Sequence, residues 1–161
     1  FHEARLPNAV LQIPPTKNKK KQCEELVKVL GNNNIHFGQV SREEVPMVQA
    51  KADVMVIALP KGNGRLCLPS KMTSYMLSGK PILASIDLNS TADRLLKVAD
   101  CGIVVDPDNI ESLRDGFIRF GSMDRSRLQT MSENSRRFAE HNLTRKANLP
   151  LVISIIETAI N

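Results

Sequence analysis

Short apolar runs alternate along the chain with longer segments in which apolar residues recur at every third or fourth position. A short apolar run bounded by turn residues is typical of a strand, and the wider spacing is typical of an amphipathic helix. Because strand and helix signals alternate throughout, the pattern predicts an α/β fold, a parallel sheet flanked by helices. The expected strands are 9–13, 35–37, 53–59, 81–85 and 102–105. The run 53–59 is almost unbroken in its apolar character, which predicts a position at the sheet centre.

Capping residues and turn residues mark the expected helix boundaries. Ser41 and Glu44 have the spacing of a capping box, and Asp108 with Glu111 is interpreted as a second cap. The expected helices are 22–30, a short helix that ends at 52, 69–78, 91–99, a helix after 108, 123–141 and a final helix from Thr144. The final helix carries apolar residues along one side, namely Leu149, Val152, Ile153, Ile156 and Ile160.

The most informative segment is 68–81, which combines a helix start, a helix stop and a following apolar strand. Pro69 suits the first turn, and Gly79 suits the left-handed residue just past the end of a helix. Ser70 and Lys71 would then lie beside free backbone N–H groups at the positive end of the helix dipole, where anions bind. The segment therefore indicates a phosphate ligand, and a nucleotide diphosphate in particular.

Length and composition fit one soluble globular domain, 1–161. No apolar run approaches the roughly 18–20 residues that span a bilayer, and the first residues do not form a signal peptide. Residues 1–5 resemble the tail of a helix cut off upstream, so a fragment is expected.

The cysteines Cys23, Cys67 and Cys101 are widely spaced, odd in number and without a CxxC pair. This pattern argues against a disulfide framework or a zinc site and favours a reducing compartment. Cys67 lies near the predicted phosphate loop, where a reactive thiol is one interpretation. A packing role is the favoured interpretation, because nothing in the sequence supplies a partner base.

The net charge of +5 indicates anionic partners without identifying them. The densest basic cluster consists of Lys17, Lys19, Lys20 and Lys21. A solvated helix start explains it best, with acidic lipid head groups or an anionic substrate as alternatives. Nucleic-acid binding ranks lower, because the chain has no Trp and one Tyr with which to stack bases.

The order of motifs resembles the C-terminal half of family-4 glycosyltransferases, in particular bacterial enzymes that build surface polysaccharides and lipid-linked sugar chains. The resemblance is carried by Asn-Ile-His-Phe at 34–37, Ser-Arg-Glu-Glu-Val-Pro at 41–46, Pro-Ser-Lys at 69–71 and Ser-Gly-Lys-Pro-Ile at 78–82. It implies a GT-B architecture, two Rossmann-like domains that face across a cleft, with the nucleotide-sugar donor on the C-terminal one. It also implies sugar transfer with retention, without a bound metal or other cofactor.

The resemblance assigns roles to two sets of residues. The expected diphosphate-binding residues are Ser70, Lys71, Gly64 and Arg65, the last two in a flexible loop, 61–65, over the donor. The expected nucleoside- or sugar-binding residues are His36, Phe37, Gly38, Ser74, Ser90 and Thr91, with Asn89 beside them. Each role has a plain alternative: a solvated lysine for Lys71, a surface loop for 61–65, a surface His and core Phe at 36–37, and a helix cap at 89–91.

Two departures from the family pattern limit these roles. A pair of glutamates that many members carry falls here on Leu66 and Ser74, so the acidic pair is absent. The first strand with its glycine-rich turn, and the acceptor domain, are also missing from this chain, so no catalytic residue is assigned. The fragment is expected to bind donor weakly and not to catalyse transfer. The final helix would normally pack partly against the missing domain, so its apolar side is expected to be an exposed patch or a dimer contact.

The leading hypothesis is the donor-binding domain of a glycosyltransferase of hexosyltransferase type that uses a UDP-sugar and a glycan or lipid-linked acceptor. The parent enzyme is expected in the cytoplasm, at the inner membrane face if its acceptor is lipid-linked. The alternative is a non-catalytic Rossmann-like module that binds a phosphate ligand or another protein.

Overall fold

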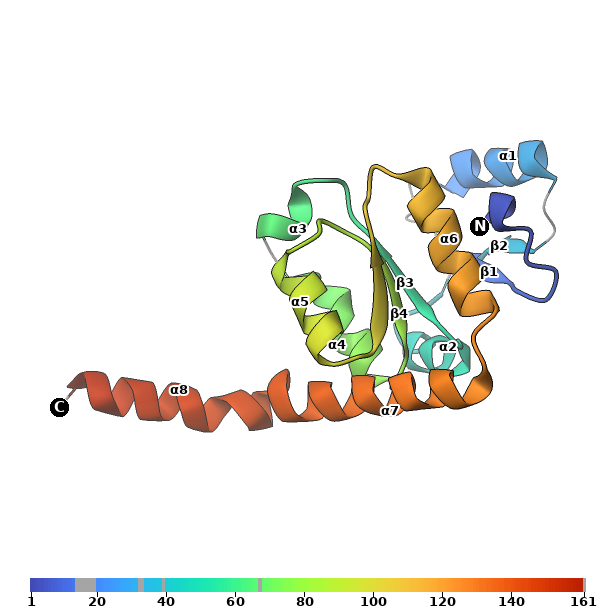
Figure 1. Cartoon of the computed structure of the whole chain (residues 1–161). Helices are drawn as coiled ribbons and strands as arrows, with labels where there is room; N and C mark the ends of the chain where they lie inside the picture. The colour runs from blue at the N-terminus through green and yellow to red at the C-terminus, as the bar shows by residue number, and fades with distance from the viewer. Residues whose placement is uncertain (14–19, 32–33, 39, 67, 161) are drawn as a thin grey trace.

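The computed structural model describes residues 1–13, 20–31, 34–38, 40–66 and 68–160. It contains two parallel sheets with helices around them (Figure 1). The smaller sheet pairs β1 (Leu11–Ile13) with β2 (Ile35–Phe37), and the larger has the order β3 (Met55–Ala58), β4 (Ile82–Ser85), β5 (Gly102–Val105). The predicted α/β class, with parallel strands flanked by helices, is confirmed.

The helices expected from the sequence appear in the expected order. The segment 61–65, predicted to be a flexible loop, instead contains the start of a short helix, α3 (Asn63–Leu66). A short 3₁₀ turn, His2–Ala4, stands where the tail of a helix was expected. The α-helices are α1 (Lys20–Leu30), α2 (Val45–Lys51), α3 (Asn63–Leu66), α4 (Ser70–Leu77), α5 (Thr91–Val98), α6 (Ile110–Gly121), α7 (Arg125–Asn142) and α8 (Arg145–Ile160).

The strand at the middle of the larger sheet is β4, not β3 as predicted. All four residues of β4 are buried, whereas β3 lies at an end of this sheet and only Ile57 is buried. An apolar run shows that a strand is largely covered, but it does not say which strands lie beside it.

Alternate residues of β4 face two separate hydrophobic clusters. Ile82 and Ala84 pack with Met72 and Met76 of α4 and with the buried side of α5. Leu83 packs on the opposite face with β5, α6 and α7. This alternation is the two-residue period of a strand, and it places α4 and α5 on one face and α6 on the other (Figure 1).

Helix α7 crosses the amino ends of the central strands. The hydroxyl of Ser135 donates to the carbonyl of Lys80, just before β4, and Asn134 Nδ2 donates to the carbonyl of Asp100, just before β5. These contacts place α7 across the amino edge of the sheet. The loops described below lie at the opposite, carboxyl edge.

The capping predictions are confirmed in part. The Ser41 N–H donates to Glu44 Oε2 at 2.9 Å and the Glu44 N–H donates to Ser41 Oγ at 3.3 Å, the reciprocal bonds of a capping box. The cap of α6 is Asn109, whose side chain accepts from the Ser112 N–H, rather than Asp108 as predicted.

Helix α8 continues the direction of α7 and projects from the rest of the molecule (Figure 1). None of its described residues is buried, and all of them except the half-buried Ala147 are exposed. The predicted apolar side is present, but Leu151 and Ile155, which lie off that side, are exposed as well. Among the described residues, no helix is both long enough and apolar enough to cross a membrane.

Two of the residue groups considered from the sequence fall partly outside the described structure. Lys17, Lys19 and Cys67 lie outside the described residues. Cys101 is buried, and burial raises the pKa of its thiol to about 11, which suits a packing role.

Candidate functional site

The strands β3, β4 and β5 run parallel, so their carboxyl ends meet at one edge of the sheet. The Leu59 N–H donates to the Ser85 carbonyl at 2.9 Å, and the Ile86 N–H donates to the Val105 carbonyl at 3.2 Å, which keeps the three ends level. Each helix that follows one of these strands begins at this edge. Open α/β sheets bind ligands outside the carboxyl ends of their strands, so this edge is the first place to look for a site.

The start of α4 lies at this edge and has the features that an anion requires. Pro69 precedes the helix without a side-chain cap, and the first turn holds no acidic residue. By contrast, side chains cap α5, α6 and α7. The first N–H groups of a helix have no partner one turn back within the helix. In α4 the Met72 N–H donates to the Pro69 carbonyl at 2.9 Å, whereas the N–H groups of Ser70 and Lys71 have no hydrogen-bond partner among the described residues, so these two are open to a ligand.

Ser70 and Lys71 are both exposed in this first turn, as predicted. Within the described part of the chain, Lys71 forms no ion pair, whereas Lys61, Lys97 and Arg127 each have a carboxylate partner. A cation at a helix start is unfavourable without an anion. Lys71 is therefore placed to meet a negatively charged ligand beside the α4 N–H groups.

The glycine loop, which we define as residues 61–64 and whose last two residues begin α3, is fastened to the end of β4. The N–H of Gly62 donates to both carboxylate oxygens of Asp87 at 2.9 Å, and the N–H of Gly64 donates to Oδ2 at 2.9 Å. Gly64 is buried and its N–H is bonded to Asp87, so it offers a ligand no free N–H. Arg65 lies in α3, and its side chain is outside the described residues.

An exposed ion pair joins the glycine loop to the loop after β5. Lys61 Nζ lies 3.2 Å from Asp108 Oδ2. The hydrogen bond to Asp108 raises the pKa of Lys61, and the charges of Asp108, Asp106 and Asp87 raise it further. The three loops at the carboxyl edge are thus tied to one another.

The turn before α5 is held by a second buried carboxylate. Asn89 has a left-handed backbone, with φ of 62°, and its N–H donates to Asp93 Oδ2 at 2.7 Å. Ser90 Oγ accepts from the Asp93 N–H at 3.2 Å, and Lys97 Nζ lies 2.9 Å from Asp93 Oδ2. The buried Oδ1 of Asp93 has no hydrogen-bond partner in the described structure.

The residues predicted to bind sugar or ribose hydroxyls differ in how accessible they are. Ser90 is buried and acts as the helix cap, the plain alternative at this position. Asn89 and Thr91 are exposed at the edge. Ser74 lies one turn inside α4, where its hydroxyl donates to the Lys71 carbonyl at 2.9 Å.

The predicted base-binding residues lie elsewhere. His36 is exposed on β2, while Phe37 and Gly38 are half-buried. Figure 1 shows β1 and β2 apart from α3, α4 and α5, with the larger sheet and α6 between them in the view. The structure therefore brings Gly64, Ser70, Lys71 and the 89–91 turn to one edge and leaves 36–38 apart from them.

Sequence reasoning missed Asp87 and Asp93, the two buried carboxylates of the edge. A signal for Asp93 was present, because Ser90 and Asp93 have capping-box spacing with Asp in place of Glu. For Asp87 the signal was weaker: an acid directly after an apolar strand, 25 residues from the glycine to which it bonds. Among the described residues, no group of three or more His, Cys, Asp or Glu side chains could hold a metal ion.

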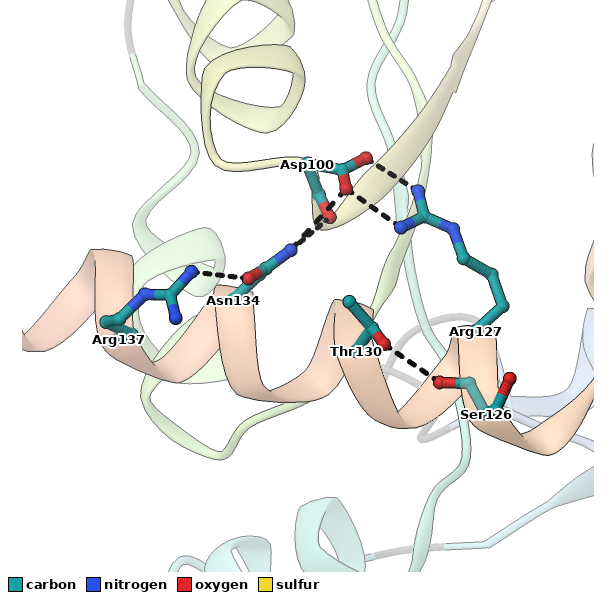
Figure 2. Close-up of polar contacts among 6 residues, drawn as sticks. All are labelled: Asp100, Ser126, Arg127, Thr130, Asn134 and Arg137. Carbon is teal, nitrogen blue, oxygen red and sulfur yellow. Dashed lines mark hydrogen bonds and ion pairs between the residues drawn. The ribbon is translucent and has the colours of Figure 1, made fainter.

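A polar network on the opposite edge holds α7 in place (Figure 2). Arg127 donates to both oxygens of Asp100 at 2.8 and 2.6 Å, Asn134 donates to Asp100 as well, and Arg137 donates to Asn134 Oδ1. Asp100 has a left-handed backbone in the turn before β5, with φ of 48°. A shallow cavity of about 300 Å³ beside this network is lined by Phe138 and His141, among others, and lies away from the carboxyl edge.

No protein-family model and no curated protein sequence matches the chain. Three solved structures are similar to it. Sucrose-phosphate synthase from Thermosynechococcus elongatus has a TM-score of 0.73 at 17% identity, over 99% of this chain and 40% of that one. WaaG, a glycosyltransferase involved in lipopolysaccharide biosynthesis, has a TM-score of 0.67 at 22% identity, over 96% of this chain and 41% of that one. HepE from Anabaena, solved in complex with UDP, has a TM-score of 0.70 at 18% identity, over 97% of this chain and 43% of that one.

These similarities establish the fold. The chain has the Rossmann-like α/β fold found in GT-B glycosyltransferases, which confirms at the level of fold the resemblance seen in the sequence. It spans about two fifths of the length of each of these structures.

Proposed function

We propose that this chain is the donor-binding domain of a glycosyltransferase and that it binds a nucleotide diphosphate sugar, with UDP as the nucleotide. The observation that carries the proposal is the start of α4, which has no side-chain cap, at the carboxyl edge of a GT-B-type sheet. Beside it lies Lys71, which forms no ion pair with any of the described residues. HepE, which has a similar fold, was solved in complex with UDP, and this supports the choice of nucleotide.

In this proposal the diphosphate lies against the first turn of α4. The backbone N–H groups and the ammonium of Lys71 face the charge that builds on the leaving nucleotide diphosphate, and the Ser70 hydroxyl donates beside them. These donors are fixed by the helix before substrate arrives. They stabilise the leaving group through charge and hydrogen bonds alone.

The start of α5 suits a different part of the donor. Asp93 already places a negative charge in its first turn, so a phosphate would be disfavoured there. The exposed Asn89 and Thr91 carry groups that bind hydroxyls. We therefore assign the sugar or ribose hydroxyls to the 89–91 turn and the diphosphate to α4.

The full reaction needs an acceptor site as well as a donor site. We propose transfer of a hexose-type sugar with retention, onto a glycan or lipid-linked acceptor bound by another domain, with residues 1–161 as the donor domain. A place in the cytoplasm, at the inner membrane face, fits the assembly of lipid-linked glycans. The description of WaaG as acting in lipopolysaccharide biosynthesis supports this class of acceptor.

A second candidate is a non-catalytic module that binds a phosphate ligand or another protein. Leu66 and Ser74 favour it, because they stand where a glycosyltransferase of this kind often has two glutamates. The hydroxyl of Ser74 is bonded within its own helix, so it does not replace the missing carboxylate at the edge. Binding of UDP-sugars in preference to inorganic phosphate separates the first candidate from the second.

The test is calorimetry of UDP with the chain and with Lys71→Ala. Loss of a charged hydrogen bond costs about 1.5–3 kcal/mol, which is on the order of a tenfold to hundredfold loss in affinity. Lys51→Ala is the control, because Lys51 is also exposed but lies at the end of α2. Equal affinity of wild type and Lys71→Ala, or no UDP binding by the wild type, would exclude the proposed site.

A further inference from the structure

Asp87 is a buried carboxylate to which sequence reasoning gave no role. Its residue is only 4% exposed and follows β4 directly, at the carboxyl edge. A buried charge is costly unless hydrogen bonds satisfy it. Here the backbone N–H groups of Gly62 and Gly64 bond to the carboxylate at 2.9 Å.

The same residue connects two loops that are distant in sequence. Its side chain holds the glycine loop, and its own carbonyl accepts from the Ser90 N–H at 3.3 Å in the turn before α5. A Cβ at Gly64 would lie 3.0 Å from Asp87 Oδ2 and 3.3 Å from the Asp87 nitrogen, so the loop and the carboxylate are in close contact. Asp87 thus determines the distance between the glycine loop and the 89–91 turn.

A loop with two glycines samples many conformations unless something fixes it. Gly62 has φ of 89°, a conformation that favours glycine, and its N–H donates to both carboxylate oxygens of Asp87. The last two residues of the loop begin α3, and the next helix, α4, begins at Ser70. Its position therefore decides how closely the backbone near Gly64 approaches a group that lies against α4.

We propose that Asp87 is a positioning residue that holds the glycine loop against the donor diphosphate and so sets the preference of the site for a diphosphate over a nucleoside or monophosphate. The inference rests on the proposed function, because it takes the diphosphate to lie at the start of α4. Asp87 does not touch the substrate. It acts through the backbone of Gly62 and Gly64.

The first experiment measures the affinity of the 161-residue chain for UDP, UMP and uridine, in the wild type and in Asp87→Asn. The amide keeps one acceptor oxygen but turns an NH₂ group toward the loop N–H groups, so the loop loosens. We expect UDP affinity to fall about tenfold, uridine affinity to stay within about twofold, and the preference for UDP over UMP to disappear. Hydrogen exchange of the Gly62 and Gly64 amides should accelerate, while exchange within β4 stays unchanged.

Asp100→Asn is the matched control. It neutralises a carboxylate with two hydrogen bonds from Arg127, but on the opposite edge of the sheet. It should leave the affinities for all three ligands unchanged. If Asp87→Asn weakens UDP and uridine to the same extent, its role is general stability and the inference is wrong.

Gly64→Ala provides a second variant if Asp87→Asn does not fold. The added methyl group would displace the loop from the Asp87 carboxylate, so the same selective loss of UDP affinity is expected. Where both variants fold, their combination should lose less affinity than the sum of the two, because both disturb one contact. Unchanged UDP affinity in either variant would overturn the inference.

The outcomes also separate this inference from the proposed function. If the wild type binds UDP and Lys71→Ala weakens it but Asp87→Asn does not, the diphosphate site stands and the role of Asp87 is wrong. If the wild type does not bind UDP, both are wrong.

Discussion

At the residue scale, small side chains decide how closely the layers of this molecule approach. Gly102 begins β5 beside β4, and a Cβ there would lie 2.7 Å from the Ile82 carbonyl oxygen and 3.1 Å from a methyl group of Leu96. The carbonyl belongs to the central strand, which cannot move without disturbing its pairing with both neighbours. Gly116 of α6 has a similar role, because a Cβ there would lie 2.7 Å from a methyl group of Leu83.

Gly102→Ala should therefore destabilise the fold by about 2 kcal/mol, the usual cost of overpacking a core. Chemical denaturation followed by circular dichroism measures the free energy of unfolding. Gly38→Ala is the control, because the nearest atom to its Cβ would be Gln12 Nε2 at an ordinary 3.8 Å. Equal stability of the two variants would show that the strands separate more easily than the structure indicates.

At the element scale, helix starts decide where a ligand can bind. Ser90, Asn109 and Asp124 cap α5, α6 and α7 with their own side chains, whereas α4 begins after Pro69 with no side-chain cap. A capped start has fewer N–H groups to offer an anion. The sequence around Pro69 thus leaves α4 without a side-chain cap, and this leaves backbone N–H groups exposed at the carboxyl edge of the sheet.

The Asp100–Arg127 ion pair is one of the contacts that attach α7 to the sheet (Figure 2). The hydrogen bond from Arg127 holds the pKa of Asp100 below its usual value. A lowered pKa in the folded state means that the ion pair stabilises the fold above the ordinary Asp pKa of about 3.9 and that this contribution is lost as the pH falls through the lower, folded value. The pair is well exposed to solvent, so its contribution is modest.

Arg127→Ala should lower the free energy of unfolding by about 0.5–1 kcal/mol at pH 7, and the difference from wild type should shrink as the pH is lowered below about 4. Urea denaturation of both proteins at pH 7 and pH 3 measures this. Arg125→Ala serves as the control, since Arg125 is exposed in the same helix turn. A difference that is independent of pH would mean that Arg127 acts through packing rather than through the charge of Asp100.

At the scale of the whole molecule, α8 stands apart from the core. Every described residue of the helix except the half-buried Ala147 is exposed, including Leu151, Ile155 and Ile160 at 59%, 59% and 78%. Exposed apolar surface of this extent favours association with another surface. The helix therefore contributes little to the stability of the sheet.

Removal of residues 145–161 should leave the midpoint of thermal unfolding nearly unchanged and should reduce self-association. Differential scanning calorimetry measures the first effect, and light scattering over a range of concentrations measures the second. Replacement of Leu151, Ile155 and Ile160 by Ser in the full chain is the matched control for the second effect. A large drop in the unfolding midpoint would show that α8 supports the core directly.

Much of this architecture could be predicted from the sequence, because it depends on local chemistry. The alternation of apolar runs and helical spacing determined the α/β class, and Gly79, with φ of 65°, ends α4 as its sequence predicted. Ser41 and Glu44 formed their capping box because both partners lie within one turn of chain. The start of α4 at Ser70, with Lys71 exposed beside it, was determined in the same way.

Only the tertiary structure decided how distant segments combine. β4 rather than β3 lies in the middle of the larger sheet, because strand order depends on which strands pair and not on the apolar content of one run. Asp87 bonds to Gly62 across 25 residues of sequence, and no local pattern predicts a contact at that separation. The features of the proposed anion site at α4 come from neighbouring residues, but the sheet positions the loops beside it, because parallel strands bring their carboxyl ends to one edge.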